Sequence, residues 1–163
     1  MRSIARPGAA VVVQASSELP ADVVDVERWA ALAKGVLLGE GVRGQAELGL
    51  TFVGEQDMAA LNLQWMGEPG PTDVLAFPLD ESTPGSEQLV MLGDVVVCPA
   101  VAARYAAEHG RTIDDELALL VVHGVLHVLG HDHVEAEETA VMTGLEASHL
   151  RRLHDPSWSH AGS

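Results

Sequence analysis

The sequence has a single cysteine and no long apolar run. Because Cys98 stands alone among the 163 residues, an internal disulfide is excluded and a reducing compartment is favoured. No apolar segment approaches the roughly 18 residues that a membrane-spanning helix needs. At the N-terminus, Arg2 and Arg6 precede only a short apolar segment at residues 11–13, which is too little for a secretory signal peptide. We therefore expect a soluble, cytoplasmic protein.

Basic residues are also scarce. The chain has 9 lysines and arginines against 24 aspartates and glutamates, which gives a formal net charge of −15 and an isoelectric point near 4.7. A protein that coats nucleic acid is normally basic, because neutralisation of phosphates supplies most of its non-specific affinity. Any nucleic acid bound by this chain must therefore enter a local groove, or be held partly by a metal ion or a partner protein.

The hydrophobic pattern predicts an α+β fold. The length and a hydrophobic content of 47% fit a single domain, which we place at residues 1–154 with a disordered tail at 155–163. Strands are expected over residues 11–14, 46–53, 73–78 and 89–97. Helices are expected over about 23–38, 56–66, 99–109, 113–129 and 135–149. This order predicts a small mixed sheet of about four strands packed by helices. The helix over 113–129 is apolar on nearly every face and is expected to be buried.

Four of the eight histidines cluster near the end of that buried helix. His123 and His127 are four positions apart, so their imidazoles share one helix face about one turn, or roughly 5.4 Å, apart. Gly130 can end the helix in a left-handed conformation, and His133 can then return as a third ligand. Three imidazoles leave a tetrahedral Zn²⁺ ion with one open position, which is typical of catalytic sites. The sequence therefore predicts a metal site on this helix.

The motif has the ligand spacing of the metzincin proteases, H-E-x-x-H-x-x-G-x-x-H, but lacks their catalytic glutamate. Gly124 occupies that position, so peptide hydrolysis is disfavoured, and the missing side chain allows another element or a substrate to pack closely. Asp132 is placed either to accept a hydrogen bond from a ligand imidazole or to cap the next helix. His131 is expected to face solvent rather than to bind the metal or a substrate. Glu116 is placed either to pair with a buried group or to remain solvated.

Together with three further segments, this motif resembles the YbeY-type endoribonucleases that mature ribosomal RNA. Residues 123–133 match H-G-x-L-H-L-x-G-x-D-H, with Val128 in one leucine position. Residues 72–78 are similar to the family's T-D-V-L-S-F-P, residues 92–94 to its L-G-D, and residues 61–62 to its L-N. Order and spacing agree from about residue 48 through the last expected helix.

The resemblance implies a compact α+β fold and a zinc ion held by His123, His127 and His133. It implies a single-strand-preferring endoribonuclease of the bacterial cytoplasm that processes the 3′ end of small-subunit ribosomal RNA and acts in ribosome quality control. The implied partners are ribosomal RNA and the small ribosomal subunit or its proteins. The chain departs from the family pattern at Met66, where an arginine is common, and at Ala76, where serine is usual. Met66 can neither bind phosphate nor stabilise its developing charge.

The leading hypothesis is zinc-assisted cleavage of RNA phosphodiesters, with three histidine ligands and Asp132 bonded to one of them. Arg104 and Arg111 are the nearest basic residues upstream; they are candidates for phosphate contact, although surface solvation is the expected role. One alternative is a zinc-stabilised, non-catalytic ribosome-binding module, which the net charge and Met66 favour. The other is a metallopeptidase, which the missing glutamate disfavours.

Overall fold

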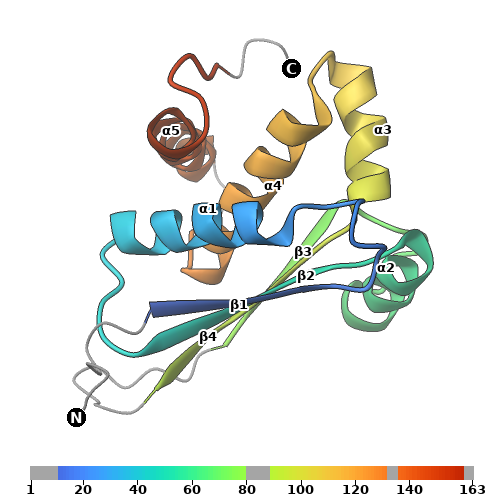
Figure 1. Cartoon of the computed structure of the whole chain (residues 1–163), viewed down its shortest axis with the longest axis horizontal. Helices are drawn as coiled ribbons and strands as arrows, with labels where there is room; N and C mark the ends of the chain where they lie inside the picture. The colour runs from blue at the N-terminus through green and yellow to red at the C-terminus, as the bar shows by residue number, and fades with distance from the viewer. Residues whose placement is uncertain (1–10, 80–88, 132–135, 160–163) are drawn as a thin grey trace.

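The computed structural model describes residues 11–79, 89–131 and 136–159. Within these residues the elements follow the order β1 (Val11–Ser17), α1 (Val26–Gly39), β2 (Ala46–Phe52), α2 (Glu55–Leu61), η2 (Asn62–Met66), β3 (Val74–Pro78), β4 (Val90–Val97), α3 (Pro99–His109), α4 (Ile113–Val128) and α5 (Ala136–Leu153). The sheet has the order β1-β2-β4-β3, in which β1, β2 and β4 are parallel and the edge strand β3 is antiparallel to β4 (Figure 1). The predicted α+β fold with a small mixed sheet is confirmed.

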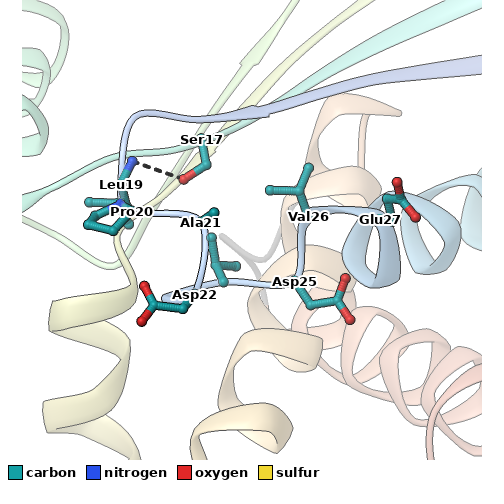
Figure 2. Close-up of a pocket in the computed structure, with 9 residues that line it drawn as sticks. Ser17, Leu19, Pro20, Ala21, Asp22, Asp25, Val26 and Glu27 are labelled. Carbon is teal, nitrogen blue, oxygen red and sulfur yellow. Dashed lines mark hydrogen bonds between the residues drawn. The ribbon is translucent and has the colours of Figure 1, made fainter.

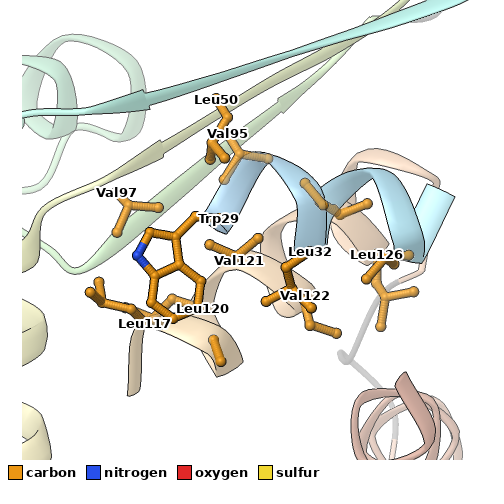
Figure 3. Packing of buried hydrophobic residues seen from close by; sticks show 14 of the residues in the cluster. Trp29, Leu32, Leu50, Val95, Val97, Leu117, Leu120, Val121, Val122 and Leu126 are labelled. Atoms are coloured by element: carbon orange, nitrogen blue, oxygen red, sulfur yellow. The ribbon is translucent and has the colours of Figure 1, made fainter. Parts of the chain in front are cut away.

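The main core lies between the sheet and helices α1 and α4. Successive residues of a strand point to opposite faces, and β2 accordingly buries Leu48, Leu50 and Phe52 while the residues between them are half-buried. Trp29 of α1 is only 2% exposed and lies among side chains from β4 and α4 (Figure 3). Helix α5 packs against α4 and α1. No helix within the described ranges is long and apolar enough to cross a membrane.

A second, smaller core packs against the other sheet face. Its buried members come from the end of β2, from α2, β3, β4 and α3, and are Val53, Met58, Leu75, Val96, Cys98 and Val101. Helix α3 begins with Pro99 at its first position and ends at Gly110 with a positive φ of 70°, as the sequence predicts. Because successive residues of a strand point to opposite faces, β3 and β4 contribute side chains to both cores. The edge strand β3 also contacts α4.

Strand β4 contains a bulge where its sequence is interrupted by Gly93. The pairing of β2 with β4 shifts register between Glu47 and Leu48, which are opposite Met91 and Gly93. Gly93 has a φ of 147°, and a Cβ atom there would lie 2.4 Å from the carbonyl oxygen of Phe77. Only glycine fits this bulge without moving the neighbouring strand.

Two helices differ from their predicted extents at the N-terminal side of the chain. Helix α1 begins at Val26 rather than near residue 23, because Asp25 caps it by accepting a hydrogen bond from the backbone N–H of Arg28 at 3.2 Å. The predicted helix over 56–66 changes at Asn62 from α2 into the π-helical turn η2. The wider turn alters the direction of the last side chains, and Trp65 is 61% exposed instead of packed in register with Met58.

The C-terminal part of the described chain packs against the main core. Helix α5 extends to Leu153, and Trp158 is 5% exposed within the main core. The backbone oxygen of Trp158 accepts a hydrogen bond from Nε of Arg151 at 3.1 Å. Trp158 therefore packs with the main core although it follows residue 154, because burial of a ring of this size is strongly favourable. Residues 160–163 lie outside the described residues.

Gly124 sets the distance between α4 and the sheet. A Cβ atom at this position would lie 2.6 Å from Cγ1 of Val95 on β4 and 3.4 Å from Cγ2 of Val74 on β3. The residue therefore permits a helix-to-sheet contact that any side chain would prevent.

Replacing Gly124 with alanine is expected to lower the free energy of unfolding by about 1–3 kcal/mol, because the added methyl group overpacks this contact. The matched control is Gly144→Ala in α5, where a Cβ atom meets nothing within 4 Å. That change is expected to raise the free energy of unfolding by about 0.5–1 kcal/mol through better helix propensity. Denaturant unfolding of both variants measures the difference, and equal effects would contradict the close contact.

Candidate functional site

The candidate site is a cavity of about 270 Å³ where α4 meets the edge strand β3 and the turn η2. His123 and His127 lie one turn apart on α4, with ring centroids 6.2 Å apart and ring planes at 37°. The structure thus brings these two imidazoles together, as their spacing predicts. The cavity is lined by Met66, Val74, Leu75, Ala76, His123, Gly124 and His127. Both positions that depart from the family pattern, Met66 and Ala76, therefore border the paired histidines.

The remaining predicted site residues, Asp132 and His133, lie outside the described residues. Among the residues that are described, no group of three or more His, Cys, Asp or Glu side chains is arranged to hold a metal ion. The complete ligand set therefore remains a prediction. The two imidazoles that the structure places do have the chemistry of a metal site, because neutral histidine is the commonest metal ligand in proteins.

A buried carboxylate from α5 orients one of these histidines. Nδ1 of His123 lies 2.6 Å from Oε2 of Glu146, whose side chain is 8% exposed. A carboxylate accepts hydrogen bonds, so Nδ1 of the neutral ring carries the proton and the lone pair is placed on Nε2. Metal-binding histidines commonly have this arrangement, which fixes the ring and its tautomer. Glu146 thus accepts a hydrogen bond from a predicted ligand imidazole, which is one of the two roles that the sequence suggested for Asp132.

A second carboxylate, Glu40, joins the end of α1 to the turn after α4 and to α5. It accepts hydrogen bonds from Nε2 of His131 at 3.1 Å and from Nε2 of His149 at 2.7 Å. Arg152 donates to the other ring nitrogen of His149 at 2.8 Å. His131 was expected to face solvent, but it is half-buried because its imidazole donates a hydrogen bond to Glu40. The sequence pattern did not indicate this carboxylate as a partner.

Hydrogen bonding lowers the pKa of the Glu40 carboxyl. Burial alone would raise this pKa, but the hydrogen bonds from His149 and His131 and the electrostatic interaction with these two residues outweigh it. The Glu40 side chain is 16% exposed. The ionised carboxylate is therefore the form that the folded protein prefers.

The two arginines considered for phosphate contact are both paired elsewhere. Arg104 forms an exposed ion pair with Glu55 at 2.9 Å. Arg111 lies 2.8 Å from Glu116, and these side chains are only 9% and 5% exposed. Glu116 is therefore the partner of a buried group rather than a solvated acid. No lysine or arginine is among the described residues that line the histidine cavity.

A larger cavity of about 550 Å³ lies at the loop between β1 and α1, and none of the described residues that line it is a histidine. Figure 2 shows the carboxylates of Asp22 and Asp25 on this loop and that of Glu27 at the start of α1, and the hydroxyl of Ser17 accepting from the backbone N–H of Leu19, a distance of 3.0 Å. Asp25 is occupied as the cap of α1, and Glu27 lies in its first turn, where acidic residues stabilise the helix dipole. Asp25 and Glu27 therefore have a structural explanation, and the candidate site remains at the histidines.

Comparison with known proteins decides the family. The family model described as endoribonuclease YbeY matches residues 14–154. The chain belongs to the YbeY family. Among family members it is 48% identical over 126 residues to the endoribonuclease YbeY of Thermobifida fusca, covering 75% of this chain and 81% of that relative. It is 47% identical over 137 residues to the endoribonuclease YbeY of Beutenbergia cavernae, covering 82% of this chain and 91% of the relative.

A solved structure shares the fold of this YbeY-family chain. The solution structure of TM1509 from Thermotoga maritima superposes with a TM-score of 0.57 at 23% identity, over 93% of this chain and 99% of that protein. The similarity supports the arrangement of sheet and helices. The match to the family model and the identity to the two relatives confirm the family predicted from the histidine motif and the three shorter segments.

Glu146 is the main feature that sequence reasoning missed, although a signal was present. Met142, Glu146 and Leu150 are four residues apart and occupy one face of α5, which is buried against the body. A carboxylate within such an apolar stripe needs a partner, because burial of an isolated charge is costly. The identity of that partner, His123, required the tertiary structure.

Replacing Glu40 with glutamine is expected to lower the free energy of unfolding at neutral pH by about 1 kcal/mol. A carboxyl whose pKa is lowered by folding stabilises the protein above its ordinary pKa of 4.5, and this contribution is lost as the pH falls through the lowered value. The difference between the two proteins should therefore shrink on acidification. Urea unfolding from about pH 7 to about pH 3.5 measures it.

The control for this pH series is Glu108→Gln at an exposed position of α3. Its unfolding free energy should stay close to that of the parent protein throughout. A Glu40→Gln deficit that stays constant or grows toward low pH would contradict the assigned role of the carboxylate.

Proposed function

We propose that this YbeY-family protein is a Zn²⁺-dependent endoribonuclease that cuts single-stranded RNA. Its physiological role would be maturation of the small-subunit ribosomal RNA 3′ end and ribosome quality control in the cytoplasm, with the small subunit or its proteins as partners. Family membership supports RNA cleavage as the activity. The cavity with two adjacent imidazoles supports a hydrolytic site.

The observation that carries the proposal is the orientation of His123 by Glu146 at the wall of this cavity. Ligation would come from His123 and His127 together with His133. Bound zinc polarises a phosphoryl oxygen and lowers the pKa of a bound water. Glu146 would keep the His123 proton on Nδ1, so that Nε2 stays available as a donor atom.

The other walls of the cavity suit a phosphodiester better than a peptide. Gly124 packs against Val95, so α4 offers no carboxylate at the position of a metzincin general base. Met66, Val74 and Ala76 make the facing wall apolar, and they would limit the access of water once a strand is bound. The cavity has a volume of about 270 Å³, which is room for part of a single strand.

The direct test is His127→Ala, which should lose bound zinc and RNA cleavage together because removal of one of three ligands opens the site. Zinc is measured by elemental analysis of protein purified without a histidine tag, and cleavage on the same sample before and after chelation. We expect about one zinc per chain in the parent protein, with activity lost on chelation and restored by zinc. An active, metal-free variant would refute the mechanism.

The matched control is His109→Ala, which removes an exposed histidine from the end of α3. This variant should keep both zinc and activity. If the parent protein holds zinc but never cuts RNA, the hypothesis of a non-catalytic ribosome-binding module is favoured. The absence of lysine and arginine among the described lining residues favours that alternative, and Met66→Arg would then be the change that tests whether cleavage can be restored.

Replacing Glu146 with alanine is expected to weaken zinc binding about 10–100-fold, because His123 loses the acceptor that fixes its tautomer. Glu146→Gln keeps an oxygen acceptor and should retain more of the affinity. Competition with a fluorescent zinc chelator gives the dissociation constants independently of any RNA assay. Unchanged affinity in Glu146→Ala would show that the carboxylate only contributes to packing.

A further inference from the structure

Trp65 is an unusually exposed aromatic residue beside the histidine cavity. Aromatic residues make up only 4% of the chain, and it has three tryptophans. Trp29 and Trp158 are 2% and 5% exposed, whereas Trp65 is 61% exposed. A tryptophan left in solvent forgoes the large stabilisation that burial of its ring would give. Leu63 and Met66 of the same turn are also 61% and 47% exposed, so Trp65 belongs to an exposed apolar surface of the kind that marks an interaction site.

The Trp65 ring lies next to a second aromatic ring on the edge of the sheet. Its centroid is 6.0 Å from that of Phe77, with the planes at 68° in an edge-to-face arrangement. Such pairs are favourable and orient the rings relative to each other. Because the rings meet edge to face and Trp65 remains 61% exposed, more than half of the surface of this residue is open to solvent.

The backbone that carries Trp65 is held in place rather than free to collapse onto the protein. Asn62, at the start of η2, is 7% exposed and donates from Nδ2 to the carbonyl oxygen of Gly70 at 2.9 Å. Gly67 ends the turn with a φ of 71°, and its N–H bonds the carbonyl oxygen of Leu63 at 3.1 Å. Single π-helical turns of this kind are frequent at functional sites.

The aromatic pair borders the candidate catalytic cavity through its neighbours in the chain. Met66, the next residue after Trp65, lines the cavity together with His123 and His127. Ala76, the residue before Phe77, also lines it. Because successive strand residues point to opposite faces and Phe77 packs with the smaller core, the aromatic pair lies across the edge of β3 from the histidines. An RNA strand whose phosphodiester lies at the histidines and that crosses this edge would place a neighbouring nucleotide at Trp65.

The charge of the chain explains why such a platform is needed. The net charge is −15, and no cation is among the described residues lining the cavity. Attraction of phosphates therefore contributes little to binding, in contrast to most nucleic-acid-binding proteins. Stacking of a base on an aromatic ring requires no charge and accepts any base, since every base has a π-face.

We propose that Trp65, supported by Phe77, is a stacking platform for an unpaired nucleobase of the RNA strand that occupies the histidine cavity. The proposal rests on the proposed ribonuclease function. It assigns selection of single strands to this surface, because the bases of a duplex are already stacked on one another and present no face to Trp65.

The test compares binding of a short fluorescent uridine oligoribonucleotide to the full chain, to Trp65→Ala and to Trp65→Phe, with a chelator present to prevent cleavage. Trp65→Ala should weaken binding about tenfold, and Trp65→Phe should retain most of the affinity. Tyr105→Ala is the matched control, because it removes a partly exposed aromatic ring of α3 that does not line the cavity. Its affinity should equal that of the parent protein.

A strand of the same length that lacks bases separates stacking from other effects. The abasic strand should bind the parent protein and Trp65→Ala equally. If Trp65→Ala weakens binding of both strands to the same extent, the residue acts through the fold or the backbone and the proposal is overturned. It is likewise overturned if RNA binding is unchanged while association with small-subunit proteins is lost, since the surface would then be a protein contact.

The zinc-loaded enzyme gives a second readout that separates this proposal from the function on which it rests. Trp65→Ala should keep its zinc and raise KM about tenfold, with a smaller change in kcat, because stacking contributes mainly to binding of the strand. A parent protein that neither binds nor cuts RNA contradicts the proposed function itself. A parent protein that cuts RNA with the same KM as Trp65→Ala contradicts only the stacking platform.

Discussion

The close contact of α4 with the sheet at Gly124 is the constraint on which the rest of this structure depends. With a valine from β4 lying 2.6 Å from where a Cβ atom would be, the helix can approach the sheet only at a residue without a side chain. The contact fixes the rotation of α4 about its own axis. His123 and His127 are thereby turned toward the edge strand β3, where a cavity remains. The same glycine that allows the packing also removes a carboxylate from this wall, so the packing and the chemistry of the site are linked.

Buried carboxylates then join the other helices to this arrangement. Glu146 connects α5 to His123, and Glu40 connects the end of α1 to His131 and His149. Each carboxylate is mostly removed from water and has an imidazole as hydrogen-bond partner, which offsets the cost of burial. Removing one partner would leave a buried charge without compensation, and this makes the positions of α1, α4 and α5 mutually dependent. The histidines near the site are thus held from two directions by side chains of different helices.

The sequence was sufficient for the sheet, for most helices and for the pairing of His123 with His127, because these depend on local periodicity. Alternation in β2 and the glycine and proline signals around α3 correspond directly to observed elements. Local patterns failed where a tertiary or cap interaction decided the outcome. Asp25 delays the start of α1, the π-helical turn redirects Trp65, and Trp158 joins the core. The sequence did not identify the partners of Glu146, Glu40 and Glu116. The histidine partners of Glu146 and Glu40 lie far away along the chain. The partner of Glu116, Arg111, was one of several possible neighbours.

The charge distribution of this chain limits which contacts can attract an RNA strand to it. The arginines considered for phosphate contact are held by Glu55 and Glu116, and Met66, which lines the cavity, carries no charge. An anionic strand approaching a protein of charge −15 gains little from long-range attraction. The proposed RNA affinity therefore depends on short-range contacts at the site: the imidazoles proposed to hold a metal ion, and the apolar or aromatic surface proposed to receive a base. Both kinds of contact meet at the junction of α4, β3 and η2, where His127, Met66 and Ala76 line one cavity. The apolar character of this wall is then consistent with a nuclease that selects strands by their exposed bases rather than by their phosphates.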